Sequence, residues 1–149
     1  MWKVPLFDLS YDEEEENAVL DVLRSKWLTS GPKTQEFEER FSDYLGHGTA
    51  CAVSSCTAAL HLALLAANIK KGDEIILSAL SFVAALNVVT LVGATPVLAD
   101  SDSLENWNIS LTDLSRKITL RTKAITLSFT LQVSPARWIL WFNLQKKRI

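Results

Sequence analysis

A run of small polar residues, Ser54-Ser55-Cys56-Thr57, stands directly before an alanine- and leucine-rich stretch that continues to Ala67. Serine and threonine often cap helices, because a side-chain oxygen can accept a hydrogen bond from a free N–H group of the first turn. The same free N–H groups, at the positive end of the helix dipole, also bind anions such as phosphate. The pattern predicts a helix opened by Thr57 and Ala58, with a plain cap and an anion site as alternatives.

Other residues that could take part in binding or catalysis stand at the ends of apolar runs. Phe82 follows the apolar run 75–77, and Asp100 and Asp102 follow the run 96–99. Phe82 could pack in the core or stack on a ligand, and the two aspartates could cap a loop or line a site. Cys51 and Cys56 have no common zinc spacing, and we interpret them as small buried or loop residues. The sequence therefore predicts no metal site.

Helical and strand patterns alternate around these residues, and the strands are continuous apolar runs. This pattern is typical of a mostly parallel sheet covered by helices on both faces, a three-layer α/β fold in which ligands bind at the carboxyl ends of strands. The helix over 57–69 is apolar almost all round, which predicts burial. The expected helices are 11–27, 33–46, 57–69, 81–93 and 108–118, and the expected strands are 50–55, 74–78, 95–100 and 122–128.

Composition excludes several classes of function. The chain has 149 residues and a formal net charge of −2, which gives no general reason to expect nucleic-acid or membrane binding. The uncharged stretch 75–99 is long enough to span a bilayer, but Gly93 and Pro96 mark a turn within it. We therefore predict strand, helix and strand there. The start of the chain lacks the apolar core of a signal peptide, which predicts a cytoplasmic protein.

The order of these segments resembles the N-terminal part of the DegT/DnrJ/StrS sugar aminotransferases. The resemblance covers about residues 4–127 and rests on "GP", "FEERFSDYLG", the long stretch from "AVSSCTAAL" to "TPVLAD", "NWNI" and "ITLRTKAI". It implies part of the large domain of an aspartate-aminotransferase-like enzyme that uses pyridoxal phosphate (PLP). It also implies a nucleotide-linked keto-sugar substrate, glutamate as amino donor, and a homodimer.

The resemblance assigns roles to particular residues. Cys56, Thr57 and Ala58 match the family residues that hold the PLP phosphate, and Phe82 matches an aromatic residue that stacks on the pyridine ring. The loop Thr29-Ser30-Gly31 matches an active-site loop near the substrate.

Nothing in residues 1–149 matches the family's Schiff-base lysine, so no catalytic residue is predicted. The chain alone is expected to be inactive and to bind PLP weakly or not at all. The resulting division is an N-terminal helical segment 1–45, a partial PLP-binding domain 46–127, and a tail 128–149 that departs from the family. No acidic residue follows Asp113, and a shift of reading frame is one hypothesis for the basic, apolar tail. The alternative function is a non-enzymatic interaction module that pairs with a full-length relative.

Overall fold

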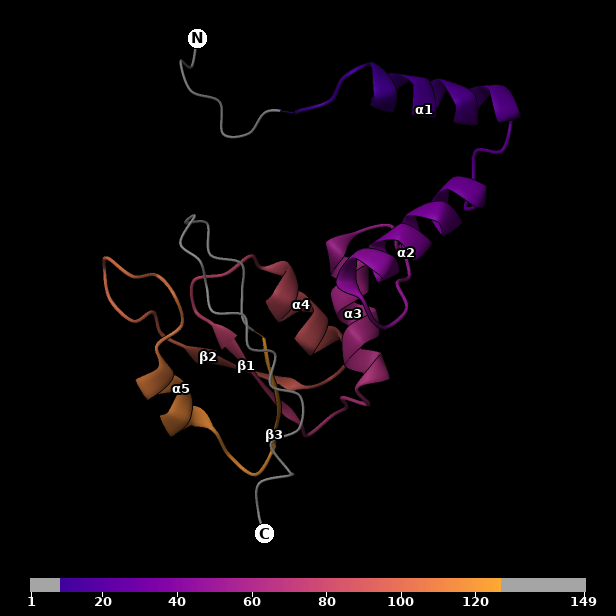
Figure 1. Ribbon diagram of the computed structural model, residues 1–149. Helices are drawn as coiled ribbons and strands as arrows, with labels where there is room; N and C mark the ends of the chain where they lie inside the picture. Colours follow the sequence, from indigo (N-terminus) through magenta and orange to yellow (C-terminus); the bar gives the residue numbers. More distant parts are fainter. Residues whose placement is uncertain (1–8, 127–149) are drawn as a thin grey trace. The chain divides into compact units, whose positions relative to one another are not determined.

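The computed structural model describes residues 9–126 and divides the chain into two compact units, residues 1–52 and 53–149. The first unit contains two helices, α1 (Glu13–Ser25) and α2 (Pro32–Leu45), joined by a short loop (Figure 1). The second unit contains the sheet. The predicted tail, 128–149, lies outside the described residues.

Local signals account for the ends of the two helices in the first unit. Asp12 caps α1 in a capping box with Glu15, and Lys26 ends it in the left-handed conformation at φ 61°. Pro32 opens α2, where its missing N–H costs no helical hydrogen bond, and Gly46 ends the helix at φ 73°. Both helices lie close to their predicted positions.

The second unit is built on a parallel sheet with strand order β2-β1-β3. Its helices alternate with the strands, which is the connectivity of right-handed crossover units. The elements are α3 (Cys56–Ala66), β1 (Glu74–Ser78), α4 (Ala84–Leu91), β2 (Thr95–Ala99), α5 (Leu111–Lys117) and β3 (Thr122–Thr126).

The side chains of the central strand β1 alternate between two apolar clusters. Ile75 and Leu77 pack with α4, including Val89, while Ile76 faces the opposite side with Ile125 and the half-buried Leu114 of α5. Helices therefore cover both faces of the sheet, as Figure 1 shows for α4 and α5. The predicted α/β fold is confirmed, and it is a partial three-layer arrangement.

The predicted strand over 50–55 is wrong, because these residues form no strand. The sheet in residues 9–126 pairs only β2, β1 and β3, and residues 50–55 pair with none of these strands. Their N–H groups bond to α2 instead: Ala50 donates to Ser42 Oγ at 2.8 Å and Ala52 to Glu38 Oε1 at 2.6 Å.

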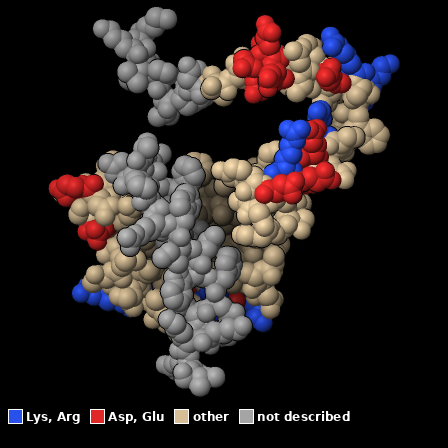
Figure 2. All heavy atoms as spheres, viewed as in Figure 1, with Lys and Arg blue, Asp and Glu red and all other residues tan. Residues whose placement is uncertain are grey.

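The expected burial of the apolar helix is also wrong. No residue of α3 is buried, and Leu62 and Leu65 are exposed although the half-buried Leu64 packs on the core. The helix contains no lysine, arginine, aspartate or glutamate, the residues that Figure 2 colours blue and red.

The stretch 75–99 is strand, helix and strand, as predicted. Within residues 9–126, no helix has the length and apolar character needed to cross a membrane.

A buried carboxylate fixes the amino ends of β1 and β3. The Glu74 side chain is only 6% exposed and forms an ion pair with Arg121 at 2.5 Å. Thr119 Oγ1 donates to the same carboxylate, also at 2.5 Å, and the Glu74 N–H donates to the carbonyl of Arg121. The network lies where the register between β1 and β3 shifts, so it holds the strands together at that irregularity.

The carboxylate of Asp113 attaches α5 to the end of β2. Its Oδ2 atom accepts from Lys117 Nζ at 2.7 Å and from the N–H of Asp100 at 2.8 Å, and Lys117 also donates to the carbonyl of Leu98. The hydrogen bond from Lys117, followed by that from Asp100, lowers the pKa of Asp113 below its usual value.

This arrangement predicts an acid-sensitive contribution to stability. A lowered folded pKa means that the stabilisation is complete above about pH 4, the ordinary aspartate value, and is lost as the pH falls through the folded pKa. We expect Asp113→Asn to reduce stability at pH 7 and to weaken its fall between pH 7 and pH 3, as measured by urea unfolding. Glu105→Gln is the control, because no side-chain partner is seen for Glu105 within residues 9–126. Equal pH profiles for Asp113→Asn and the unsubstituted chain would contradict this role.

Candidate functional site

Ser55 caps the start of α3. Its backbone is extended, at φ −164° and ψ 159°, and its Oγ accepts a hydrogen bond from the N–H of Ala58 at 3.1 Å. The Ser55 carbonyl accepts the N–H of Ala59 at 3.0 Å. The second bond is the first regular bond of the helix, so the Ser55 side chain caps one otherwise free N–H group, that of Ala58.

Two further N–H groups remain free at this helix start. The helix opens at Cys56, one residue earlier than predicted, and the N–H groups of Cys56 and Thr57 have no hydrogen-bond partner in the described part of the chain. The expectation that the Ala58 N–H is free is wrong, because the Ser55 hydroxyl occupies it. The cap therefore leaves the N–H groups of Cys56 and Thr57 available to an anion, so the two alternatives are compatible.

The surroundings of this helix start favour an anion. Ser55, Cys56 and Thr57 are all exposed, so a ligand can reach their N–H groups. No acidic residue occurs between Asp43 and Asp73 in the sequence. The Ser55 hydroxyl accepts from Ala58 but keeps its own proton to donate. The site therefore offers three donors.

Phe82 lies in the loop between β1 and α4, at the carboxyl end of the central strand. Its side chain is 74% exposed, so the alternative of core packing is excluded within residues 9–126. Val83, which precedes α4, makes no side-chain cap. Because α3 packs against α4, the structure places Cys56 and Phe82 at the amino ends of two adjacent helices.

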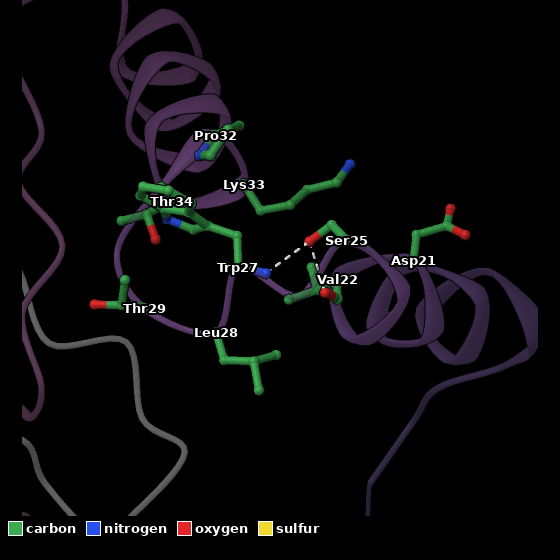
Figure 3. A pocket seen from close by; sticks show the side chains of 10 residues that line it. Asp21, Val22, Ser25, Trp27, Leu28, Thr29, Pro32, Lys33 and Thr34 are labelled. Carbon is green, nitrogen blue, oxygen red and sulfur yellow. Dashed lines mark hydrogen bonds between the residues drawn. The ribbon is translucent and has the colours of Figure 1, made fainter.

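The loop Thr29-Ser30-Gly31 belongs to the first unit, where it joins α1 to α2. It borders a pocket of about 580 Å³ at the junction of the two helices (Figure 3). Trp27 forms part of the wall and donates from its indole N–H to the Ser30 carbonyl at 3.0 Å. The sequence analysis did not predict this contact, because a loop has no periodic pattern that shows where its side chains lie. The pocket is lined by Asp21, Val22, Ser25, Trp27, Leu28, Thr29, Gly31, Pro32, Lys33 and Thr34.

The remaining polar candidates have structural roles. Asp100 Oδ1 accepts the N–H of Ser101, and Asp102 Oδ2 accepts from Asn106, so both aspartates cap the loop after β2. Both cysteines are free and exposed, so the alternative of burial is wrong for both. Cys51 lies in a loop and Cys56 at the start of α3. Within residues 9–126, no three histidine, cysteine, aspartate or glutamate residues form a metal-binding group.

These features together fit a phosphorylated aromatic cofactor. Free N–H groups at a helix start suit its phosphate, and an exposed aromatic side chain at a strand's carboxyl end suits its ring. A parallel α/β sheet with such a helix start defines part of the large domain of a PLP-dependent transferase. The chain belongs to the DegT/DnrJ/EryC1/StrS aminotransferase family, whose sequence profile matches residues 9–129.

Relatives and solved structures agree with this assignment. The chain is 47% identical over 122 residues to the uncharacterized protein MJ1066 of Methanocaldococcus jannaschii, covering 82% of this chain and 31% of that protein. It is 42% identical over 123 residues to the GDP-perosamine synthase of Escherichia coli O157:H7, covering 82% of this chain and 34% of the synthase.

Among solved structures, the PLP form of Spr1654 from Streptococcus pneumoniae, described as a sugar aminotransferase, matches with a TM-score of 0.76 and 37% identity over 83% of this chain and 31% of that one. The E. coli GDP-4-keto-6-deoxy-D-mannose-3-dehydratase with bound hydrated PLP matches with a TM-score of 0.71 and 31% identity, over 81% of this chain and 32% of that one. The chain spans about a third of the length of these relatives.

Proposed function

We propose that this chain supplies the phosphate-binding part of a PLP-dependent aminotransferase that acts on nucleotide-linked keto-sugars. The observation that carries the proposal is the pair of free N–H groups of Cys56 and Thr57 at the start of α3, in a chain of this aminotransferase family. Glutamate is the amino donor and the intact enzyme is a homodimer in this proposal. The nucleotide portion of the substrate is consistent with the GDP-perosamine synthase relative.

Each candidate residue has a distinct role in this proposal. The N–H groups of Cys56 and Thr57 hold the cofactor phosphate, and the Ser55 hydroxyl adds a third donor. Ala58 lies beside them and has a small side chain that leaves room for the phosphate. The Phe82 side chain provides a face for the pyridine ring. When bound, PLP supplies the electron sink for amino transfer.

The proposal places the substrate loop in the N-terminal helical segment, residues 1–45, and the phosphate site in the partial domain 46–127. Thr29, Ser30 and Gly31 form the loop, whose hydroxyl and backbone groups are available to a sugar.

We further propose that residues 1–149 do not catalyse amino transfer by themselves, because none of their lysines serves as the Schiff-base residue. Lys117 supports this view, since its Nζ is engaged by Asp113 and by the carbonyl of Leu98. Lys70 and Lys71 are exposed in the turn before β1, which is the amino end of the strand and the opposite end from Phe82.

A second candidate function, a non-enzymatic module that pairs with a full-length relative, is favoured by one observation. The outer face of α3 is apolar and exposed, including Leu62 and Leu65. Exposed apolar surface of this kind is typical of a protein that binds another protein chain.

The experiment that tests the proposal is reduction of the purified chain with borohydride in the presence of PLP, followed by mapping of labelled lysines. We expect scattered, substoichiometric labelling of exposed lysines and no transfer of an amino group from glutamate to a keto-sugar nucleotide. Pyridoxal, which has no phosphate, is the control for non-specific labelling. Stoichiometric labelling of a single lysine together with turnover would contradict the proposed inactivity of these residues.

A further inference from the structure

Glycine is required at position 31 because a side chain would not fit there, and not because of the backbone conformation. Its φ of −170° and ψ of −154° are extended values that any residue adopts. A Cβ atom at this position would lie 2.3 Å from Trp27 Nε1 and 2.5 Å from Trp27 Cδ1. Such distances are far inside van der Waals contact, so the missing side chain of Gly31 makes room for the indole ring.

Trp27 makes two polar contacts, one through its indole ring and one through its backbone. The indole N–H donates to the Ser30 carbonyl at 3.0 Å, although the residue is 57% exposed. The Trp27 backbone N–H donates to Ser25 Oγ at 3.2 Å, and that hydroxyl donates to the Val22 carbonyl at 2.7 Å in α1. Figure 3 shows Ser25 joined in this way to both Val22 and Trp27.

The other end of the loop is fixed to α2. The Gly31 carbonyl accepts the N–H of Gln35 at 3.0 Å, and Pro32 restricts the backbone at the first helical position. Trp27 thus bridges the end of α1 and the start of α2 across Thr29 and Ser30. Its exposure shows that the ring is not placed there to fill the core.

We propose that Trp27 is the positioning residue of the Thr29-Ser30-Gly31 loop, acting through its hydrogen bond to Ser30 and its close contact with Gly31. The role as a substrate loop rests on the proposed function. Holding the loop in one conformation before the substrate arrives reduces the entropy lost on binding. It also fixes the wall of the pocket that Trp27 and Thr29 share.

The test uses nuclear magnetic resonance of the full chain without PLP or sugar, so its result does not depend on cofactor binding. Trp27→Phe keeps an aromatic ring but removes the indole donor, and it identifies the Trp27 indole signal by its disappearance. Gly31→Ala introduces the clash. The double variant Trp27→Ala/Gly31→Ala removes the ring that the new methyl group would meet.

We expect the Trp27 indole hydrogen to exchange with solvent on the order of tenfold more slowly than a free indole, as one net hydrogen bond allows. Gly31→Ala should abolish that protection and shift the amide signals of Thr29 and Ser30. Trp27→Phe should shift the same two amides while the far-UV circular dichroism stays unchanged. Compared with Trp27→Ala alone, the double variant should show no further shift of any amide signal other than that of residue 31.

Trp107 is the matched control, because its indole N–H also donates to a backbone carbonyl, that of Leu104, at 2.8 Å. Its signal should stay in place in every variant. Unchanged Thr29 and Ser30 signals in Trp27→Phe, or an unchanged Trp27 indole in Gly31→Ala, would overturn the proposal.

Discussion

Replacing Leu77 with alanine is expected to lower the free energy of unfolding by about 2–5 kcal/mol. Leu77 is 1% exposed in the central strand β1, and it belongs to the cluster formed with Ile75 and with Ala85 and Val89 of α4. Removal of its side chain forfeits buried apolar area and leaves a cavity that the two flanking strands cannot close. Urea unfolding followed by circular dichroism measures the change.

Leu120→Ala is the matched control, because the same atoms are removed from a side chain that is 86% exposed. Its effect should stay within about 0.5 kcal/mol. Total stabilities of single domains are about 5–15 kcal/mol, so the Leu77 variant loses a large share of the total. Equal losses for the two variants would contradict the position of β1 at the centre of the core.

Replacing Cys56 with proline is expected to weaken PLP binding by roughly 10- to 100-fold, the effect of losing one charge-assisted hydrogen bond. Proline has no N–H, and it is well tolerated at the first helical position. The preceding residue, Ser55, is already extended at ψ 159°, the conformation that proline requires of its neighbour. The helix should therefore persist while one phosphate donor disappears.

Cys56→Ala is the matched control, because it removes the thiol but keeps the N–H group. It should bind PLP within about twofold of the unsubstituted chain. If the alanine variant lost as much affinity as the proline variant, the side chain and not the backbone would carry the interaction. Similar affinities for all three proteins would show that the Cys56 N–H has no part in binding.

Most of the secondary structure could be predicted because local signals agree with the tertiary structure. The run 74–78 is bounded by a turn at Gly72 and forms β1 with the predicted limits. The α2 helix follows from Pro32 at its start and Gly46 at its end. Strand order and the division of β1 between two clusters required the structure, because periodicity says nothing about which strands pair.

The predictions that failed are those that depend on partners elsewhere in the fold. Residues 50–55 have strand-like composition, but a strand needs a hydrogen-bonded neighbour, and these residues pair with no strand in residues 9–126. The α3 helix is apolar almost all round, yet none of its residues is buried in the structure. An apolar pattern thus indicates that burial of a segment is favourable, but it does not show that the segment is buried.

The candidate site was predictable in part. Small polar residues before an apolar helix indicated a helix start with free N–H groups, although the start is at Cys56 and the cap occupies the Ala58 N–H. The roles of Phe82 and of the Thr29-Ser30-Gly31 loop came from family resemblance, since loop residues carry no periodic signal. The contact of Trp27 with Gly31 is spatial, and only the structure shows it.

The most direct test of the central claim is to titrate the isotope-labelled chain with PLP and follow its amide signals. We predict saturable shifts concentrated at Cys56 and Thr57, with a smaller effect at Ala58 because its N–H is held by Ser55. Pyridoxal should leave these signals in place, since it lacks the phosphate. Shifts of equal size with pyridoxal, or PLP-dependent shifts confined to residues outside the start of α3, would contradict a phosphate site at this helix.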